Sequence, residues 1–298
     1  MFVLSKEKAL VIGKGFLGEK LFHLLEEKGF EARIASLEEK TDYKIDITDI
    51  ASIDSVFGKF KPKFVFLAAA ISNVDFCEEN KDKCFAVNLH GARNTALCCK
   101  EFGSKLVFVS TDFVFDGEKG FYDETDKPNP INVYGKSKFE AEKAILGLKM
   151  KDLIIARTST LYGFNSFFDK TTFVSWVVKS LSEKKEINVV FDQKTSPTLI
   201  DDLAESLIDL CKMKAEGLFH VAGSEPMDRL SFAKKIAEIF ELDESLIKKI
   251  DSNQLNQKAR RPRDASLKIK KLNSMGIKTK NTEDGLKEMK KQMEKKNS

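Results

Sequence analysis

The sequence has few residues of the kinds that mark disulfide-rich, zinc-binding or histidine-dependent proteins. Its three histidines are not spaced as metal ligands. Its cysteines are odd in number, lack CxxC spacing and lie mostly in helix-like apolar sequence, as reduced core thiols would. They are Cys77, Cys84, Cys98, Cys99 and Cys211. We therefore expect no metal site, and hydrolytic triads built on histidine are disfavoured.

Long apolar runs are also lacking. No stretch of about 18 uncharged apolar residues occurs, and the run "MFVLSKEKALVIG" contains Lys and Glu before a signal-like core can form. We expect a cytoplasmic protein with no membrane partner. The net charge of +4 is spread over a chain in which 32% of the residues are charged, which describes a mixed, solvated surface. This pattern does not favour a nucleic-acid partner.

The chain does have a regular alternation of strand-like and helix-like segments. Segments such as 16–29 and 85–103 have the apolar spacing of amphipathic helices and end at glycine. Uninterrupted apolar runs between the helices indicate strands that are covered on both faces, as in a parallel sheet. These runs are 9–13, 31–35, 64–70, 105–110 and 153–158. We predict an α/β fold with a Rossmann-type doubly wound parallel sheet, whose ligands lie at the carboxyl ends of the strands.

Beyond residue 160 this alternation becomes less regular, and no low-complexity linker separates the two parts. We expect strands at 187–191 and 218–222. The expected helices are 166–184, 200–213, 229–241 and 282–295. The sequence thus predicts a Rossmann domain over residues 1–160 and a smaller α/β C-terminal substrate lobe over residues 161–298. Some of the lobe's chain is expected to cross back to the Rossmann sheet.

A glycine-rich loop, "GKGFLG", joins the first predicted strand to a helix. In such loops Gly13 would make the tight turn, Gly15 would let the backbone approach a pyrophosphate, and Gly18 would let helix and strand pack closely. Phe16 and Leu17 complete the loop, and we expect them to contact a dinucleotide as well. A plain turn is the alternative, but the strand before and the helix after favour a cofactor site.

The end of the second strand bears on the choice of cofactor. NAD-selective sites usually carry an acidic residue about 20 positions after the glycines, whereas "EARIAS" offers Arg33. This favours the 2′-phosphate of NADPH, with NADH as an alternative, although Arg33 can also be an ordinary exposed strand residue. Asp46 would accept a hydrogen bond from adenine or merely cap the helix that starts near Asp49. Ile47 belongs to the same predicted adenine site.

Small and hydroxyl-bearing residues stand at the ends of two later strands. Ala68, Ala69 and Ala70 would leave room for a cofactor to lie across the sheet, with core packing as the alternative. The next strand ends with Ser110 and Thr111, which place hydroxyl groups at the same edge. We therefore expect the cofactor and the reacting group to meet there.

Tyr134 and Lys138 are four residues apart in a helix-like stretch and would share one face. The alternative is two ordinary residues on a solvated helix. A phenol with its usual pKa near 10 is a poor proton donor at neutral pH. Lowering this pKa by about 3 units requires roughly 4 kcal/mol of stabilisation of the anion, which a buried ammonium can supply. We predict that Thr111 binds a substrate carbonyl, that Tyr134 protonates it, and that Lys138 holds the ribose and lowers the pKa of Tyr134.

Several segments resemble the extended short-chain dehydrogenase/reductases and, within them, the dTDP-4-dehydrorhamnose reductase family. The similar stretches include "FAVNLHGARN", "VSTDFVFDG", "NVYGKSKFEAEKAI" and "ARRPRDASL", and together they run from about residue 10 to 276. By this resemblance Thr111, Tyr134 and Lys138 match the catalytic triad of the family. Such a match implies a Rossmann domain that carries NADPH and a lobe that holds a nucleotide sugar.

The resemblance assigns three further residues. Ser72 matches a hydroxyl residue near the substrate, and Asn88 matches the asparagine of the "VN" pair. Arg261 lies where related enzymes present an arginine to the diphosphate, which needs bidentate cationic donors; a surface basic run is the alternative. Thr160 stands where these reductases commonly have tryptophan, and the glycine loop is one residue shorter than the usual GxxGxxG. The identity of the sugar therefore stays open.

The function implied by the resemblance is NADPH-dependent reduction of the C4 carbonyl of a nucleotide-activated 4-keto-6-deoxysugar, as in dTDP-rhamnose biosynthesis. One alternative is a nucleotide-sugar epimerase or dehydratase, which would retain its nicotinamide. Another is a non-catalytic, NADP-binding regulatory subunit similar to the β subunit of methionine adenosyltransferase, which also has "LYG" at the place of residues 161–163. The sequence leaves the oligomeric state open, including a homodimer.

Overall fold

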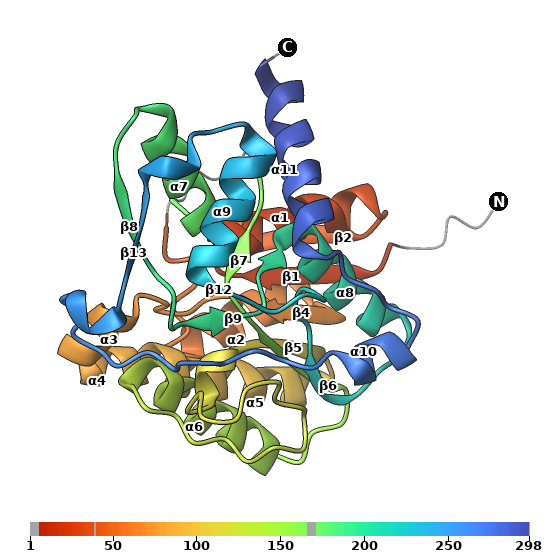
Figure 1. Cartoon of the computed structure of the whole chain (residues 1–298). Helices are drawn as coiled ribbons and strands as arrows, with labels where there is room; N and C mark the ends of the chain where they lie inside the picture. Colours follow the sequence, from red (N-terminus) through yellow and green to blue (C-terminus); the bar gives the residue numbers. More distant parts are fainter. Residues whose placement is uncertain (1–5, 39, 166–170, 298) are drawn as a thin grey trace.

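A seven-stranded parallel sheet forms the centre of the molecule (Figure 1). The computed structural model describes residues 6–38, 40–165 and 171–297. In spatial order the strands are β11 (Gly217–His220), β6 (Leu153–Thr158), β5 (Lys105–Thr111), β4 (Phe64–Leu67), β1 (Lys8–Ile12), β2 (Glu31–Ser36) and β3 (Tyr43–Lys44). The chain therefore winds outward in both directions from β1 and β4, which confirms the predicted doubly wound α/β fold.

Both faces of the sheet are covered by helices because both faces of its strands are apolar. One face packs against α1 (Phe16–Glu27) and α8 (Ile200–Lys212). The opposite face packs against α2 (Ile50–Phe60), α5 (Ala92–Phe102) and α6 (Val133–Gly147). Along β1 the side chains alternate between the two, with Ala9 and Val11 on the first face and Leu10 and Ile12 on the second.

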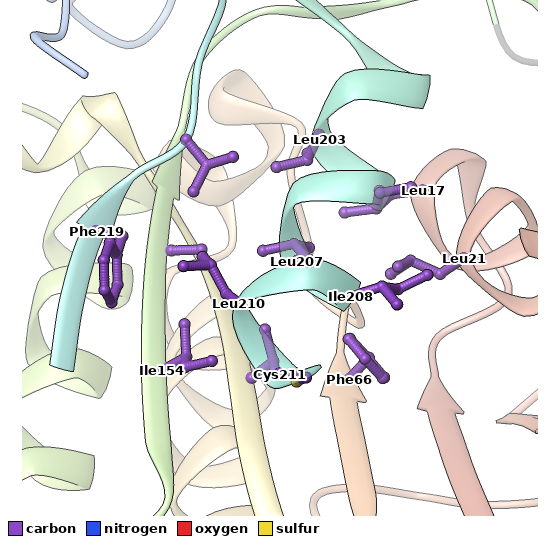
Figure 2. Close-up of a cluster of buried hydrophobic side chains, with 14 of the residues drawn as sticks. Leu17, Leu21, Phe66, Ile154, Leu203, Leu207, Ile208, Leu210, Cys211 and Phe219 are labelled. Atoms are coloured by element: carbon purple, nitrogen blue, oxygen red, sulfur yellow. The ribbon is translucent and has the colours of Figure 1, made fainter. Parts of the chain in front are cut away.

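The C-terminal half contributes directly to this sheet. Strand β11 pairs in parallel with β6, and α8 packs its leucines onto the face that α1 also covers (Figure 2). Figure 2 shows Leu203, Leu207 and Leu210 of α8 above the strands, with Leu17 and Leu21 of α1 beside them. The chain thus returns to the Rossmann sheet after residue 160.

The remaining C-terminal elements build a smaller layer with its own core. Its helices are α7 (Phe173–Ser182), α9 (Arg229–Phe240) and α11 (Thr282–Asn297). Its short strand pairs are β7 (Leu161–Tyr162) with β10 (Thr198–Leu199), β9 (Lys194–Thr195) with β12 (Met227–Asp228), and β8 (Ile187–Val190) with β13 (Ile247–Ile250). Helix α10 (Lys270–Ser274) instead packs Leu272 into the core on the sheet face that α1 covers. The predicted helix 166–184 begins later, at α7, where Thr172 and Ser175 form a capping box; residues 166–170 lie outside the described residues.

The predicted helix 85–103 is divided into several segments. It follows two short helices, α3 (Val74–Glu79) and α4 (Lys81–Phe85), continues as a π-helix over Ala86–Gly91, and ends as α5. A π-helical turn places one extra residue in the helix and commonly occurs at functional sites. Single turns of 3₁₀-helix lie at Asp112–Val114, Glu244–Leu246 and Ser252–Gln254.

Candidate active site

A cavity of about 880 Å³ lies at the carboxyl ends of the central strands. The predicted residues that line it are Gly15, Phe16, Leu17, Gly18, Ala68, Ala70, Ser72, Thr111, Tyr134 and Lys138. Residues of the C-terminal half, among them Phe173 and Arg229, close the other side. We call this space the main cavity.

The glycine loop forms one end of the main cavity. Gly13 has a φ of +109°, and a Cβ atom there would stand 2.5 Å from the backbone nitrogen of Ala69. A Cβ at Gly18 would stand 1.8 Å from the carbonyl oxygen of Gly13, whereas one at Gly15 would meet nothing within 4 Å. Gly13 and Gly18 are therefore needed for packing, while the space beside Gly15 is open to a ligand.

The amino terminus of α1 is directed at that open space. Gly15 is its N-cap and supplies no side-chain hydrogen bond to the first turn. The first N–H groups of a helix lack partners within the helix and favour anions. The loop thus has the room and the donors that a pyrophosphate requires.

Arg33 does not line the main cavity. It is three residues before Ser36, the last residue of β2, which is about 10 Å along a strand. Its Nη1 donates to the carbonyl oxygen of Ala32 at 2.8 Å, and its guanidinium lies 5.9 Å from the ring centroid of Phe60. Its position in the strand therefore keeps Arg33 back from the edge at which the glycine loop opens.

Asp46 and Ile47 support the fold near the predicted adenine site. The Oδ1 atom of Asp46 accepts hydrogen bonds from the backbone N–H and the hydroxyl of Thr48, at 2.9 and 2.7 Å. Ile47 is buried against Gly91, while Asp49 caps α2. Neither Asp46 nor Ile47 lines the main cavity, so a contact of either with adenine stays a prediction.

The residues after β4 divide between lining the cavity and supporting it. Ala68, Ala70 and Ser72 line it, whereas the backbone of Ala69 lies behind Gly13. Asn88, in the π-helix, is buried: its Oδ1 accepts from the N–H of Ile71 at 2.8 Å and its Nδ2 donates to the Ser137 hydroxyl at 3.0 Å. Asn88 thus ties the loop after β4 to α6 and does not line the cavity.

Thr111, Tyr134 and Lys138 come together at the centre of the main cavity. Thr111 is the last residue of β5, and the other two lie on α6, whose N-cap Asn132 accepts a hydrogen bond from Gly135. A Cβ at Gly135 would stand 2.0 Å from the carbonyl oxygen of Phe113, so the helix packs directly on the chain after β5. This close packing brings the tyrosine and the threonine to the same place.

Burial controls the ionisation of both residues on α6. It lowers the pKa of Lys138 to about 7, against the attraction of Glu142, and the amine lies 4.0 Å from the ring centroid of Phe108. Burial raises the pKa of Tyr134; the Thr111 hydroxyl opposes this rise and Asp112 adds to it. The predicted net lowering of the Tyr134 pKa is therefore contradicted, because burial raises this pKa and the contact that lowers it comes from Thr111.

Asp112 is a cavity residue that sequence reasoning missed. It is buried, its Oδ1 accepts from the Thr111 hydroxyl at 3.0 Å, and its Oδ2 accepts from the Ser159 hydroxyl at 2.6 Å. Burial raises the pKa of Asp112 to about 6, although both hydroxyl groups lower it. Its place directly after Thr111 at a strand end was a signal that could have identified it.

Arg229 is the second missed residue. It is the first residue of α9, and its Nη2 is 3.5 Å from the Thr160 hydroxyl oxygen, to which it donates. The guanidinium carbon lies 4.9 Å from the ring centroid of Phe173. No local pattern marks residue 229, because the fold alone brings it to the residues that follow β6.

Arg261 lies outside the main cavity and is paired. Its Nη1 and Nη2 atoms donate to Oδ1 and Oδ2 of Asp75 at 3.0 and 2.9 Å, and Nη1 also donates to the carbonyl oxygen of Ala259 at 2.6 Å. Arg261 lines an adjoining space of about 500 Å³, which we call the side cavity. Asp75 thus already occupies the bidentate face of this guanidinium.

All five cysteines are free and buried. No group of three or more His, Cys, Asp or Glu side chains in residues 6–38, 40–165 and 171–297 is arranged to hold a metal ion. Within those same residues, no helix has the length and apolar character needed to cross a membrane.

Comparison with known proteins gives matches along nearly the whole chain. The family model described as the RmlD substrate binding domain matches residues 7–295. The spore coat polysaccharide biosynthesis protein SpsK of Bacillus subtilis is 35% identical over 284 residues, which cover 94% of this chain and 96% of SpsK. The methionine adenosyltransferase 2 subunit beta of Bos taurus is 30% identical, with 78% of this chain and 71% of that protein covered.

A solved structure supports the same relationship. The dTDP-4-dehydrorhamnose reductase of Bacillus anthracis, crystallised in complex with NADP, superposes with a TM-score of 0.88 at 30% identity. The superposition covers 95% of this chain and 98% of that one. The likeness therefore includes both the Rossmann sheet and the C-terminal layer.

Proposed function

The chain belongs to the family of the RmlD substrate binding domain, and from this membership we propose that it is an NADPH-dependent reductase of a nucleotide-activated 4-keto-6-deoxysugar. Hydride would be delivered to the C4 carbonyl. The observation that carries the proposal is that Thr111, Tyr134 and Lys138 line one cavity together with an open glycine loop. A dTDP-linked sugar is the first candidate, because the similar Bacillus anthracis structure is a dTDP-4-dehydrorhamnose reductase.

The residues present fit a dinucleotide cofactor. The space beside Gly15 and the first turn of α1 would hold the pyrophosphate, and Ala68 and Ala70 leave room for the ring system. The Lys138 amine would hold the ribose. When bound, NADPH supplies the hydride. The NADP in the Bacillus anthracis reductase supports this choice, and NADH is the alternative.

The protein residues would act on the keto oxygen. Thr111 would turn its hydroxyl proton from Asp112 to the keto oxygen and donate a hydrogen bond to it. Tyr134 would transfer its proton to the alkoxide that forms. Because burial raises the pKa of Tyr134, the phenol stays protonated at neutral pH, and an alkoxide is a stronger base than a phenolate. Lys138, with a pKa of about 7, can then return a proton to the tyrosine.

The two predicted regions would divide the work. Residues 1–160 supply the glycine loop, Thr111, Tyr134 and Lys138, and residues 161–298 supply Phe173, Arg229 and Arg261. We keep this division as part of the proposal for function, although β11 and α8 pack into the first region. Ser72 and Arg261 remain proposed substrate contacts.

The direct test mixes the purified protein with NADPH and dTDP-4-keto-6-deoxy-L-mannose and follows the absorbance of the reduced nicotinamide. We expect stoichiometric oxidation. Bound NADPH with no oxidation, on this and on the corresponding UDP-linked sugar, would refute the reductase proposal. Cofactor that stays bound and cycles while the sugar changes configuration would instead identify an epimerase.

The 30% identity to methionine adenosyltransferase 2 subunit beta favours a regulatory subunit as the second candidate. In that case NADPH would bind, no nucleotide sugar would be reduced, and a partner enzyme's activity would change equally with the wild-type chain and with Tyr134→Phe. A reductase predicts that the substitution removes the activity of the chain alone.

A further inference from the structure

The main cavity and the side cavity meet at a junction. Four of the residues that the structure describes line both: Val74, Phe113, Phe173 and Arg229. Three of them are apolar, so Arg229 is the one charged side chain among these shared residues. Any ligand that extends from one cavity into the other passes this guanidinium.

Few of the donors of Arg229 are used. Within the described part of the chain, the side chain makes one hydrogen bond, and at 3.5 Å to Thr160 it is at the long limit for such bonds. The Phe173 ring supports the guanidinium from one side. A guanidinium has five N–H donors in a fixed fork, so most of them remain available to a ligand.

The charges around Arg229 are of both signs, and it is Arg261 that favours an incoming anion. The nearby Asp112 attracts its charge and Arg261 repels it, while burial lowers the pKa of Arg229. The carboxylate of Asp112 is already held by the hydroxyl groups of Thr111 and Ser159. A phosphate at the junction would relieve the repulsion between the two arginines.

Arg261 differs from Arg229 because most of its donors already have partners. Asp75 and the carbonyl oxygen of Ala259 accept from three of its five N–H donors, and its side chain is 13% exposed. A ligand would have to displace Asp75 before it could form a bidentate contact there. Arg261 does not line the main cavity; it lines the side cavity and a further space of about 890 Å³.

If the proposed function holds, the sugar, diphosphate and nucleoside of the substrate follow one another in the same order as the main cavity, the junction and the side cavity. The sugar must lie in the main cavity beside Tyr134. The side cavity, which Trp176 and residues 188–190 line, would take the nucleoside. The diphosphate between them would then lie at the junction.

We propose that Arg229, rather than Arg261, is the principal diphosphate-binding residue and binds the sugar-side phosphate at the junction of the two cavities. This inference rests on the proposed function, and it assigns a substrate-binding role to a residue that the sequence did not indicate. Arg261 then acts mainly through its ion pair with Asp75, which fixes the loop that carries it against α3.

The test compares the binding of UDP and dTDP with that of uridine and thymidine, by calorimetry, to wild type, Arg229→Gln and Arg229→Lys. We expect Arg229→Gln to weaken binding of the diphosphate that the wild type prefers by about 10- to 100-fold, because a charge-assisted hydrogen-bond pair is lost. Binding of the matching nucleoside and of NADPH should stay the same, which also shows that the variant folds. Arg229→Lys should recover part of the loss.

The matched control removes the other arginine together with its partner. In Asp75→Asn/Arg261→Gln the diphosphate should bind with a smaller loss than in Arg229→Gln. A larger loss in the double variant, or no loss in Arg229→Gln, would overturn the inference while the reductase proposal stands.

The two proposals can fail separately. If the wild type binds neither UDP nor dTDP, the inference on Arg229 is overturned whatever the reductase assay shows. If a diphosphate binds through Arg229 but no sugar is reduced, the inference holds and the reductase proposal fails.

Discussion

The two walls of the main cavity are built in different ways. The wall on the sheet side consists of a glycine loop, strand ends and the first turns of α6, all held by close backbone contacts such as that of Gly135 with Phe113. The opposite wall consists of side chains from separate elements, among them Phe173 of α7 and Arg229 of α9. Backbone packing fixes the shape of the sheet-side wall, whereas the identity of individual side chains determines the shape of the opposite wall.

This difference suggests how the chain divides chemistry from specificity. Substitutions on the sheet-side wall should change whether hydride transfer occurs at all, because Tyr134 and the glycine loop lie there. Substitutions on the opposite wall should change which ligand binds.

Tyr134→Phe should have the largest effect on catalysis. Removing the proton donor should lower kcat/KM by about 10²- to 10⁴-fold. NADPH binding should persist, because the ring remains in place. Steady-state oxidation of NADPH together with fluorescence titration of the cofactor measures both quantities.

Tyr43→Phe is the matched control for this change, since Tyr43 lies on β3 and does not line the cavity. It should leave kcat/KM at the wild-type level. Equal losses in the two variants would mean that the phenol of Tyr134 has no special part in the reaction.

Gly18→Ala and Gly15→Ala should separate packing from ligand space within one loop. A Cβ at Gly18 would meet the carbonyl oxygen of Gly13, so we expect a loss of roughly 3 kcal/mol in the free energy of unfolding, as for other overpacked sites. Gly15→Ala should leave the free energy of unfolding unchanged and weaken NADPH binding. Urea unfolding without cofactor measures the first effect and cofactor titration the second. If Gly15→Ala bound NADPH as tightly as wild type, the pyrophosphate would lie elsewhere.

Lys138 should make stability depend on pH in a defined window. Its folded-state pKa of about 7 lies below the 10.5 of an ordinary lysine, so between these values the unfolded chain binds more protons and stability rises with pH. From pH 7 to 9 this rise should reach about 2 kcal/mol, and Lys138→Met should remove it. Lys136→Met, on an exposed part of the same helix, should keep it. Urea unfolding at pH 7, 8 and 9 measures the slope; an unchanged slope in Lys138→Met would mean that the amine is not buried as described.

The substitution Asp112→Asn should have the smallest effect, a change in the pH dependence of kcat/KM. Its carboxyl group titrates with a pKa of about 6, and its ionised form raises the pKa of Tyr134. The wild-type kcat/KM should therefore fall a few-fold as the pH rises through 6, because the phenol becomes a weaker acid. Asp112→Asn should not show this fall. A pH profile that is the same in both proteins would contradict the assignment.

The sheet-side wall could be predicted from the sequence because each of its parts is a local pattern. Alternating apolar segments specify the sheet, the spacing of Gly13, Gly15 and Gly18 specifies the loop, and helical spacing puts Tyr134 and Lys138 on one face. The carboxyl ends of parallel strands then meet at one edge. These rules need no knowledge of distant contacts.

The residues of the opposite wall, the ion pairs and the pKa values of the cavity residues could not be predicted in this way. The contact of Arg229 with Thr160 joins residues 69 positions apart, and the Asp75–Arg261 pair joins residues 186 apart. The place of Arg33 relative to the glycine loop depends on where β2 stops, so its contact with a 2′-phosphate stays a prediction. The pKa of Tyr134 depends on burial, which the sequence does not quantify.

The most direct test of the central claim is a single turnover with NADPH that carries deuterium at the transferable position of its nicotinamide ring. With dTDP-4-keto-6-deoxy-L-mannose, mass spectrometry should find one deuterium at C4 of the product sugar for each NADPH oxidised, and none within the same time in Tyr134→Phe. Bound NADPH that keeps its deuterium in the wild-type protein, with this sugar and its UDP-linked counterpart, would contradict the account.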